Sequence, residues 1–135
     1  MTNIPQKLSA IALLLAMSFA NWPMQAQAMS PEQIKPILQM TKANWIGYRD
    51  YDGQQLIYFT HLESWTCGIA SVRYGLNGQA AEQIWPLATC DPKKPNQVDK
   101  ERPYLSFPLG HVKSIAVRLI FSDQSESETV NFPAP

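Results

Sequence analysis

The sequence predicts an all-β protein, a single antiparallel β-sandwich of six to seven strands that follows a signal peptide and a short N-terminal helix. Hydrophobicity alternates with a period of two from Ala43 onward, tight-turn dipeptides separate the apolar runs, and one long proline-rich connection interrupts them. Short strands with closely spaced turn signals are typical of a sandwich. A small β-barrel is the alternative that this pattern leaves open.

Residues 1–28 have the features of a secretory signal peptide. Lys7 precedes an uncharged, mostly apolar run from Leu8 to Ala20, which is too short to span a bilayer, and Ala26-Gln27-Ala28 matches an A-x-A cleavage site. A competing site after Ala20 would leave a longer mature N-terminus. We therefore expect three parts: the signal peptide (1–28), an N-terminal helix or turn segment (29–42) and the β-sandwich domain (43–135).

The charge of the chain argues against two classes of partner. Eleven basic and eleven acidic residues give a formal net charge of +0. Nucleic acid and anionic membrane surfaces are normally bound by a clustered positive field. We expect neither partner, and no membrane span after cleavage of the signal peptide.

The N-terminal segment carries the start signals of a helix. Ser30 suits an N-cap, Pro31 the first turn and Gln33 the capping-box position. Apolar residues follow at helical spacing. Pro36 argues against a long helix, so a short helix or turn is expected here.

The strands are predicted from alternation and from two turn dipeptides. "NWIGYRDYDGQQLIYFTHL" reads as a hairpin closed by Asp52-Gly53, and the run after Cys67 ends in Asn77-Gly78. Pro86 removes a hydrogen-bond donor from the following run, "EQIWPLATC", which makes it an edge strand.

The C-terminal residues read as a closing hairpin with the clearest alternation in the chain. Lys113 and Arg118 are expected to face solvent. The residues expected to face the core together are Ile115, Val117, Leu119, Phe121, Val130 and Phe132.

The stretch "CDPKKPNQVDKERPYLSFPLG" contains four prolines and is excluded from regular helices and central strands. We expect an ordered surface loop. Its length suits either a crossover between two sheets or a binding loop.

The compartment decides how the two cysteines are interpreted. In an exported domain, Cys67 and Cys90 are expected to form one disulfide, which stabilises by roughly 3 kcal/mol for a loop of this length. The alternative is a Cys67 nucleophile with His61 or His111 as its base. A metal site is disfavoured because the chain has neither a CxxC nor an HxxxH pattern.

Two stretches resemble known domains. "VRYGLNG" and "VKSIAVRLIFSDQSESETVNF" resemble strands of immunoglobulin-like or fibronectin-III-like domains of exported bacterial proteins. "YRDYDGQQLIYFTHLESWTCGIASVRYGLNG" resembles a group of small secreted bacterial proteins. The resemblance implies the sandwich fold and a bacterial envelope location, and it brings no catalytic residues. Trp65 precedes Cys67, which departs from the immunoglobulin order, in which the tryptophan lies between the cysteines as Trp85 does here.

No catalytic constellation stands out. His61 and Glu63 would share one face of a strand, which is more typical of a solvated strand end than of a catalytic dyad. The serines lack a G-x-S-x-G context, and there is no glycine-rich phosphate loop. We expect a protein without catalysis, cofactor or metal.

A binding module is the class best supported by composition. Tryptophans and tyrosines are frequent in the strands and suit carbohydrate or protein surfaces. Trp85, on the expected edge strand, is the predicted anchor, next to a basic loop that carries Lys93, Lys94, Lys100 and Arg102. The expected function is binding of a protein or glycan of the cell envelope by a periplasmic or secreted protein. The alternative is a small periplasmic enzyme that uses His61 or His111.

Overall fold

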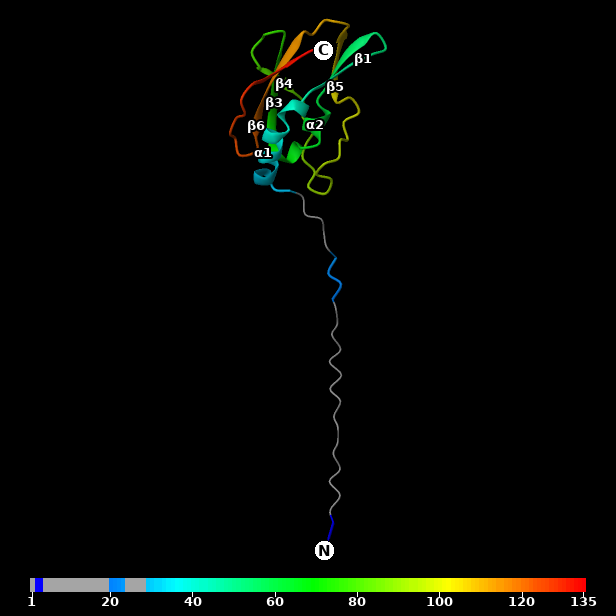
Figure 1. Cartoon of the computed structure of the whole chain (residues 1–135), viewed down its shortest axis with the longest axis vertical. Helices are drawn as coiled ribbons and strands as arrows, with labels where there is room; N and C mark the ends of the chain where they lie inside the picture. The colour runs from blue at the N-terminus through cyan, green and yellow to red at the C-terminus, as the bar shows by residue number, and fades with distance from the viewer. Residues whose placement is uncertain (1, 4–19, 24–28) are drawn as a thin grey trace.

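The computed structural model describes residues 2–3, 20–23 and 29–135, and these residues confirm the predicted all-β class. Seven strands form two antiparallel sheets (Figure 1). Sheet A has three strands in the order β1-β2-β5, and sheet B has four in the order β4-β3-β6-β7. Most of the predicted signal peptide lies outside the described residues. Within the described ranges, no helix combines the length and the apolarity needed to cross a bilayer.

The elements follow one another along the chain with short connections, except for the long segment between β4 and β5. Their bounds are α1 (Pro31–Met40), the 3-10 turn η1 (Lys42–Asn44), β1 (Gly47–Tyr51), β2 (Gln54–Tyr58), α2 (Thr60–Glu63), the 3-10 turn η2 (Thr66–Gly68), β3 (Ile69–Leu76), β4 (Gln83–Trp85), β5 (Tyr104–Pro108), β6 (Ser114–Phe121) and β7 (Val130–Pro133).

Helix α1 begins at the predicted capping box. The Ser30 N–H donates to Gln33 Oε1 at 2.8 Å, and the Gln33 N–H donates back toward Ser30. Ile34 of this helix is buried. It lies so close to Gly68 that a Cβ added to residue 68 would come within 2.2 Å of the Ile34 side chain. A glycine in η2 therefore allows the helix to pack directly on the start of β3.

Both turn dipeptides have the backbone that their residue types predict. Asp52 and Gly53 have φ of 52° and 72°, and Asn77 and Gly78 have φ of 53° and 82°. Asparagine, aspartate and glycine tolerate this left-handed region at little cost. The first pair closes the β1–β2 hairpin, and the second begins the turn from β3 toward β4.

Strand β6 is the centre of the core, as its alternation predicts. Its side chains alternate between half-buried and buried positions along the whole strand. Val130 and Phe132 of β7 are partly buried against the same core, and Lys113 is exposed. The four fully buried residues of β6 are Ile115, Val117, Leu119 and Phe121.

The expected strand end at His61 and Glu63 is wrong, because these residues form the short helix α2. Phe59 and Leu62 are both completely buried and are three residues apart, which places them on one face of a helical turn. The turn also buries Glu63, which is 2% exposed. Burial of this apolar pair therefore outweighs the strand pattern.

Candidate functional site

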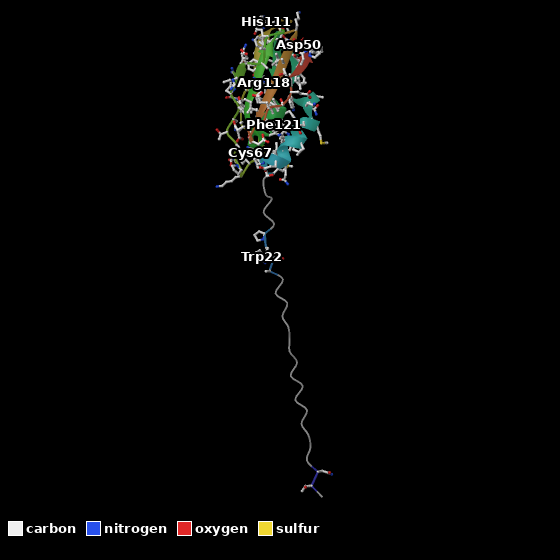
Figure 2. The ribbon with its side chains drawn as sticks, turned by 90° about the vertical axis from the view of Figure 1, so that its left-hand side faces the viewer. Trp22, Asp50, Cys67, His111, Arg118 and Phe121 are labelled. Atoms are coloured by element: carbon white, nitrogen blue, oxygen red, sulfur yellow. A yellow bond between two sulfur atoms is a disulfide. The ribbon has the colours of Figure 1, made fainter. Side chains whose placement is uncertain are left out.

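The two cysteines of the chain form the predicted disulfide. Cys67 lies in η2 and Cys90 at the start of the long β4–β5 connection, with 2.00 Å between the sulfur atoms. Cys67 is therefore not available as a thiolate nucleophile. Figure 2 also places Cys67 and His111 toward opposite ends of the domain, so His111 is not positioned to act on it.

Both histidines have structural partners. His61 Nε2 lies 2.9 Å from Thr41 Oγ1, and the single Thr41 hydroxyl proton is donated to the Ile37 carbonyl at 2.8 Å. The imidazole N–H therefore donates to Thr41, and burial lowers the pKa of His61. The ring of His111 stacks on Phe107 with 5.4 Å between centroids.

The expected exposure of Trp85 is wrong. Trp85 is 3% exposed, and its ring stacks on Phe59 with a centroid distance of 4.1 Å and an interplanar angle of 5°. β4 is an edge strand, but alternation turns Ile84, 60% exposed, outward and its neighbour inward. The side chain of Trp85 is thus part of the core and is not presented to a partner.

A buried carboxylate holds Trp85 in place. Glu63 Oε1 accepts the Trp85 indole N–H at 2.8 Å, and Oε2 accepts the Ala88 N–H at 3.3 Å. Lys100 reaches the same group from the long loop: its Nζ lies 3.8 Å from Glu63 Oε1, donates to the Pro86 carbonyl and sits 5.1 Å from the Trp85 ring centroid. Lys100 therefore anchors the loop to the core.

The other charged side chains of the long loop are exposed, and the two signs are balanced among them. Asn96 Nδ2 donates to the Ser64 carbonyl at 2.9 Å, which ties the middle of the loop to the end of α2. Three predicted basic residues are exposed, and three exposed acidic residues are interspersed among them. The six are Lys93, Lys94, Arg102, Asp91, Asp99 and Glu101.

The outward side of sheet A forms a second candidate surface. The register pairs Gly47 with Tyr58 and Tyr58 with Tyr104, and alternation puts every second residue on the same side of the sheet. Ile57, which precedes Tyr58 on β2, points to the other side of the sheet, faces the core and is completely buried. We call this surface the tyrosine face; it consists of Gly47, Arg49, Tyr51, Gln54, Leu56, Tyr58, Tyr104, Ser106 and Pro108.

The tyrosine face combines aromatic rings with hydrogen-bonding groups. Tyr58 and Tyr104 are 5.2 Å apart between ring centroids. The guanidinium of Arg49 lies 4.3 Å from the centroid of the Tyr51 ring, and Tyr51 is 57% exposed. In Figure 1, β1 and β5 lie on the other side of the domain from β3 and β6, so this face looks away from sheet B.

The sequence did not reveal the tyrosine face, because it does not show which tyrosines face the core and which face outward. Tyr48 and Tyr74 turn toward the core, whereas Tyr51, Tyr58 and Tyr104 turn outward. The available signal was the Asp52-Gly53 turn, which fixes the hairpin register and therefore the side on which each residue lies.

A cavity of about 220 Å³ lies beside β1, on the side of sheet A to which Tyr48 and Gln55 turn, opposite the tyrosine face. Its lining includes Tyr48, Arg49, Asp50, Gln55, Val112 and Lys113. Gln55 is buried, and its amide exchanges two 2.9 Å hydrogen bonds with the Val112 backbone. These hydrogen bonds fix the Gln55 part of the lining, which also includes Gly110, Ala134 and Pro135.

Comparison with known proteins leaves the function to be inferred from this geometry. The resemblance to immunoglobulin-like and fibronectin-III-like domains stays a prediction. No family model matches the sequence, and no curated protein or solved structure is significantly similar to it.

Proposed function

We propose that this protein is an exported, non-catalytic binding module that holds a saccharide chain of the cell envelope on its tyrosine face. The observation that carries the proposal is the presence of three outward tyrosines on a three-stranded sheet. Tyr58 and Tyr104 are paired at one end of the face and Tyr51 lies at the other end, with polar side chains between them. Tyr51 is the most exposed of the three rings.

The chemistry of the face matches that of a sugar. A pyranose ring has an apolar C–H face and a rim of hydroxyl groups, so it packs on an aromatic ring while its rim forms hydrogen bonds. Tyr51 and Tyr104 offer rings at the two ends of the face, and Arg49 offers donors between them. Gln54 and Ser106 also lie on this face and are hydrogen-bonded to each other. Both can form hydrogen bonds with sugar hydroxyl groups.

The disulfide supports a location outside the cytosol. Disulfides persist in oxidising compartments and are rare where thiols are kept reduced. Cys67–Cys90 closes the loop that contains β3 and β4, so an oxidising environment contributes directly to the stability of the domain. This agrees with the export signal expected at residues 1–28.

Two other candidate functions have weaker support. A protein partner bound through the long loop would meet balanced exposed charges, and neither Trp85 nor Lys100 is free to contribute. An enzyme that uses His61 or His111 would need a nucleophile and an orienting group. The two rings instead contact Thr41 and Phe107.

The test is binding of purified protein to insoluble peptidoglycan by co-sedimentation and to soluble oligosaccharides by calorimetry. Tyr51→Ala and Tyr104→Ala should each weaken binding by roughly tenfold, as expected when an anchoring aromatic is truncated. Ile84→Ala is the matched control, because Ile84 is equally exposed but lies on sheet B. Equal loss in all three variants, or no binding to any saccharide, would contradict the proposal.

A further inference from the structure

We propose that the ligand of the tyrosine face is an internal stretch of an extended, β-1,4-linked saccharide chain, which lies along the strands and contacts two aromatic sites at once. One site is the Tyr58–Tyr104 pair and the other is Tyr51. This inference rests on the proposed function and names the class of saccharide that the same surface takes.

The two aromatic sites lie at opposite ends of the tyrosine face. Tyr58 pairs with Tyr104 across β2 and β5, whereas Tyr51 pairs with Gln54 across β1 and β2. Gln54 and Tyr58 are four residues apart on β2, and a strand rises about 3.3 Å per residue, so the sites are separated by about 13 Å along the sheet. A disaccharide is shorter than this separation, whereas a tetrasaccharide can span it. Only a chain of that length or more is therefore expected to contact both sites.

The Tyr58–Tyr104 pair forms an angled site. Its two rings are half-buried, 5.2 Å apart between centroids and inclined to each other at 53°. The rings cannot both stack on one face of the same sugar, so one packs on the apolar face and the other contacts the edge of the pyranose. The pair therefore holds one sugar unit and leaves the neighbouring units to lie along the sheet.

Tyr51 forms the second site on the most open part of the face. Its side chain is 57% exposed, and the turn residues that follow it, Asp52 and Gly53, are exposed as well. The Arg49 guanidinium lies over one side of the Tyr51 ring, 4.3 Å from the centroid, so a sugar packs on the other side. In Figure 1 the tip of this hairpin lies at the margin of the domain, where a chain can continue past Tyr51. The site therefore suits an internal unit of a polymer.

The part of the face between the two sites offers hydrogen-bonding groups. Leu56 lies between Arg49 and Ser106 in the register, and it is only 6% exposed although it is not part of the core, so neighbouring side chains cover it. Ser106 donates its hydroxyl proton to Gln54 Oε1, which leaves the Gln54 amide N–H groups and the Ser106 oxygen for sugar hydroxyl groups. A chain that crosses from one site to the other can therefore form hydrogen bonds on the way.

The path between the two sites favours a β-1,4 linkage. Both sites lie on one side of a three-stranded sheet, in which adjacent strands are rotated by only about 20–25°. Pyranoses joined by β-1,4 linkages form an extended ribbon with apolar ring faces along its whole length. Pyranoses joined by α-1,4 linkages form a curved chain, which turns away from a surface after a few units. The extended chain is the one that reaches both sites.

The experiment measures by calorimetry the affinity of the protein for chito-oligosaccharides, which are soluble β-1,4-linked chains. The tetrasaccharide should bind about tenfold more tightly than the disaccharide, because it engages a second anchoring aromatic site, and the hexasaccharide should gain little more. Tyr51→Ala should bring the ratio of the tetrasaccharide and disaccharide affinities close to one, and so should the double variant Tyr58→Ala with Tyr104→Ala. Ile84→Ala on sheet B is the control and should keep the ratio.

The ratio separates contact with the ligand from loss of stability. A variant that is only less stable lowers both affinities by the same factor and leaves their ratio unchanged. Maltotetraose, whose linkages are α-1,4, tests the shape of the chain and should bind at least about tenfold more weakly than the chito-tetrasaccharide.

The outcomes distinguish this inference from the proposed function. If the disaccharide and the tetrasaccharide bind equally tightly, or if Tyr51→Ala leaves their ratio unchanged, saccharide binding stands and contact with two sites is overturned. If maltotetraose binds as tightly as the chito-tetrasaccharide, or if other saccharides bind but no chito-oligosaccharide does, the extended β-1,4-linked chain is not the ligand. If no saccharide binds, the proposed function itself is refuted, and this inference with it.

Discussion

Replacing Lys100 with methionine tests whether the long loop is held by the buried carboxylate of Glu63. Methionine keeps the apolar stem that lies against the Trp85 ring but removes the ammonium group. The Pro86 carbonyl then loses a donor, and Glu63 loses its nearest cation while retaining the Trp85 and Ala88 N–H groups. We expect Lys100→Met to destabilise the protein.

The magnitude follows from the separation and the burial of the two charges. At 3.8 Å, the Coulomb attraction is about 4 kcal/mol for an effective dielectric constant near 20. Desolvation of both groups offsets part of this, since the Glu63 side chain is 1% exposed and that of Lys100 23%. Charged hydrogen bonds typically contribute about 1.5–3 kcal/mol, so a loss of about 2 kcal/mol is expected.

Urea unfolding followed by tryptophan fluorescence measures this loss. A change of about 2 kcal/mol should lower the urea midpoint by roughly 1 M for a domain of this size. Lys94→Met is the matched control, because Lys94 is exposed in the same loop, and its midpoint should stay close to that of the unmodified protein.

A double-mutant cycle supplies the decisive result. In a Glu63→Gln background no carboxylate is left uncompensated, so Lys100→Met should cost at least about 1 kcal/mol less than it does alone. If Lys100→Met costs the same in both backgrounds, or no more than Lys94→Met, Lys100 is not the anchor and the loop is held by the disulfide and Asn96.

Three further predictions concern the core, the disulfide and a surface carboxylate. Leu119→Ala should lower the free energy of unfolding by about 2–4 kcal/mol in the same assay, because Leu119 is fully buried. Arg118→Ala should lower it by less than about 1 kcal/mol, because Arg118 pairs with exposed Glu126. Equal effects would mean that the β6 register is wrong. Cys67→Ser and Cys90→Ser should each lower stability by about 2–4 kcal/mol and by similar amounts, and labelling of the unmodified protein by iodoacetamide would show that the disulfide is not formed. Hydrogen bonds from the Ser125 side chain and backbone, together with Lys35, lower the pKa of Asp123 from 3.8 to about 2. The stabilisation that the Asp123 carboxylate provides is thus complete above pH 3.8 and is lost as the pH falls through about 2. Ser125→Ala should raise the pKa of Asp123 in a carbon-13 NMR titration.

Local patterns predicted the parts of the fold that local physics determines. The alternation of β6 identified the buried residues from Ile115 to Phe121, because a half-buried strand separates its two sides residue by residue. Asp52-Gly53 and Asn77-Gly78 were recognised because few residues tolerate positive φ. The disulfide was predicted from the expected compartment and the number of cysteines alone.

The features that were missed depend on contacts between distant segments. The partner of the Trp85 indole is Glu63, and Lys100 reaches both from the far end of the loop, so no spacing in the sequence indicates the cluster. Helix α2 is too short for a helical period to be recognised. The tyrosine face appears only when β5 is aligned beside β2, which a hairpin pattern cannot supply.

The pairing of β3 with β6 also affects how a growing chain folds during synthesis. Val72 lies opposite Leu119, so the two central strands of sheet B come from distant parts of the polypeptide. Until β6 has been synthesised, β3 lacks its central neighbour, and such non-local pairing forms late and slowly. Sheet B therefore cannot be completed until β6 and β7, which lie in the C-terminal third of the sequence, have been synthesised.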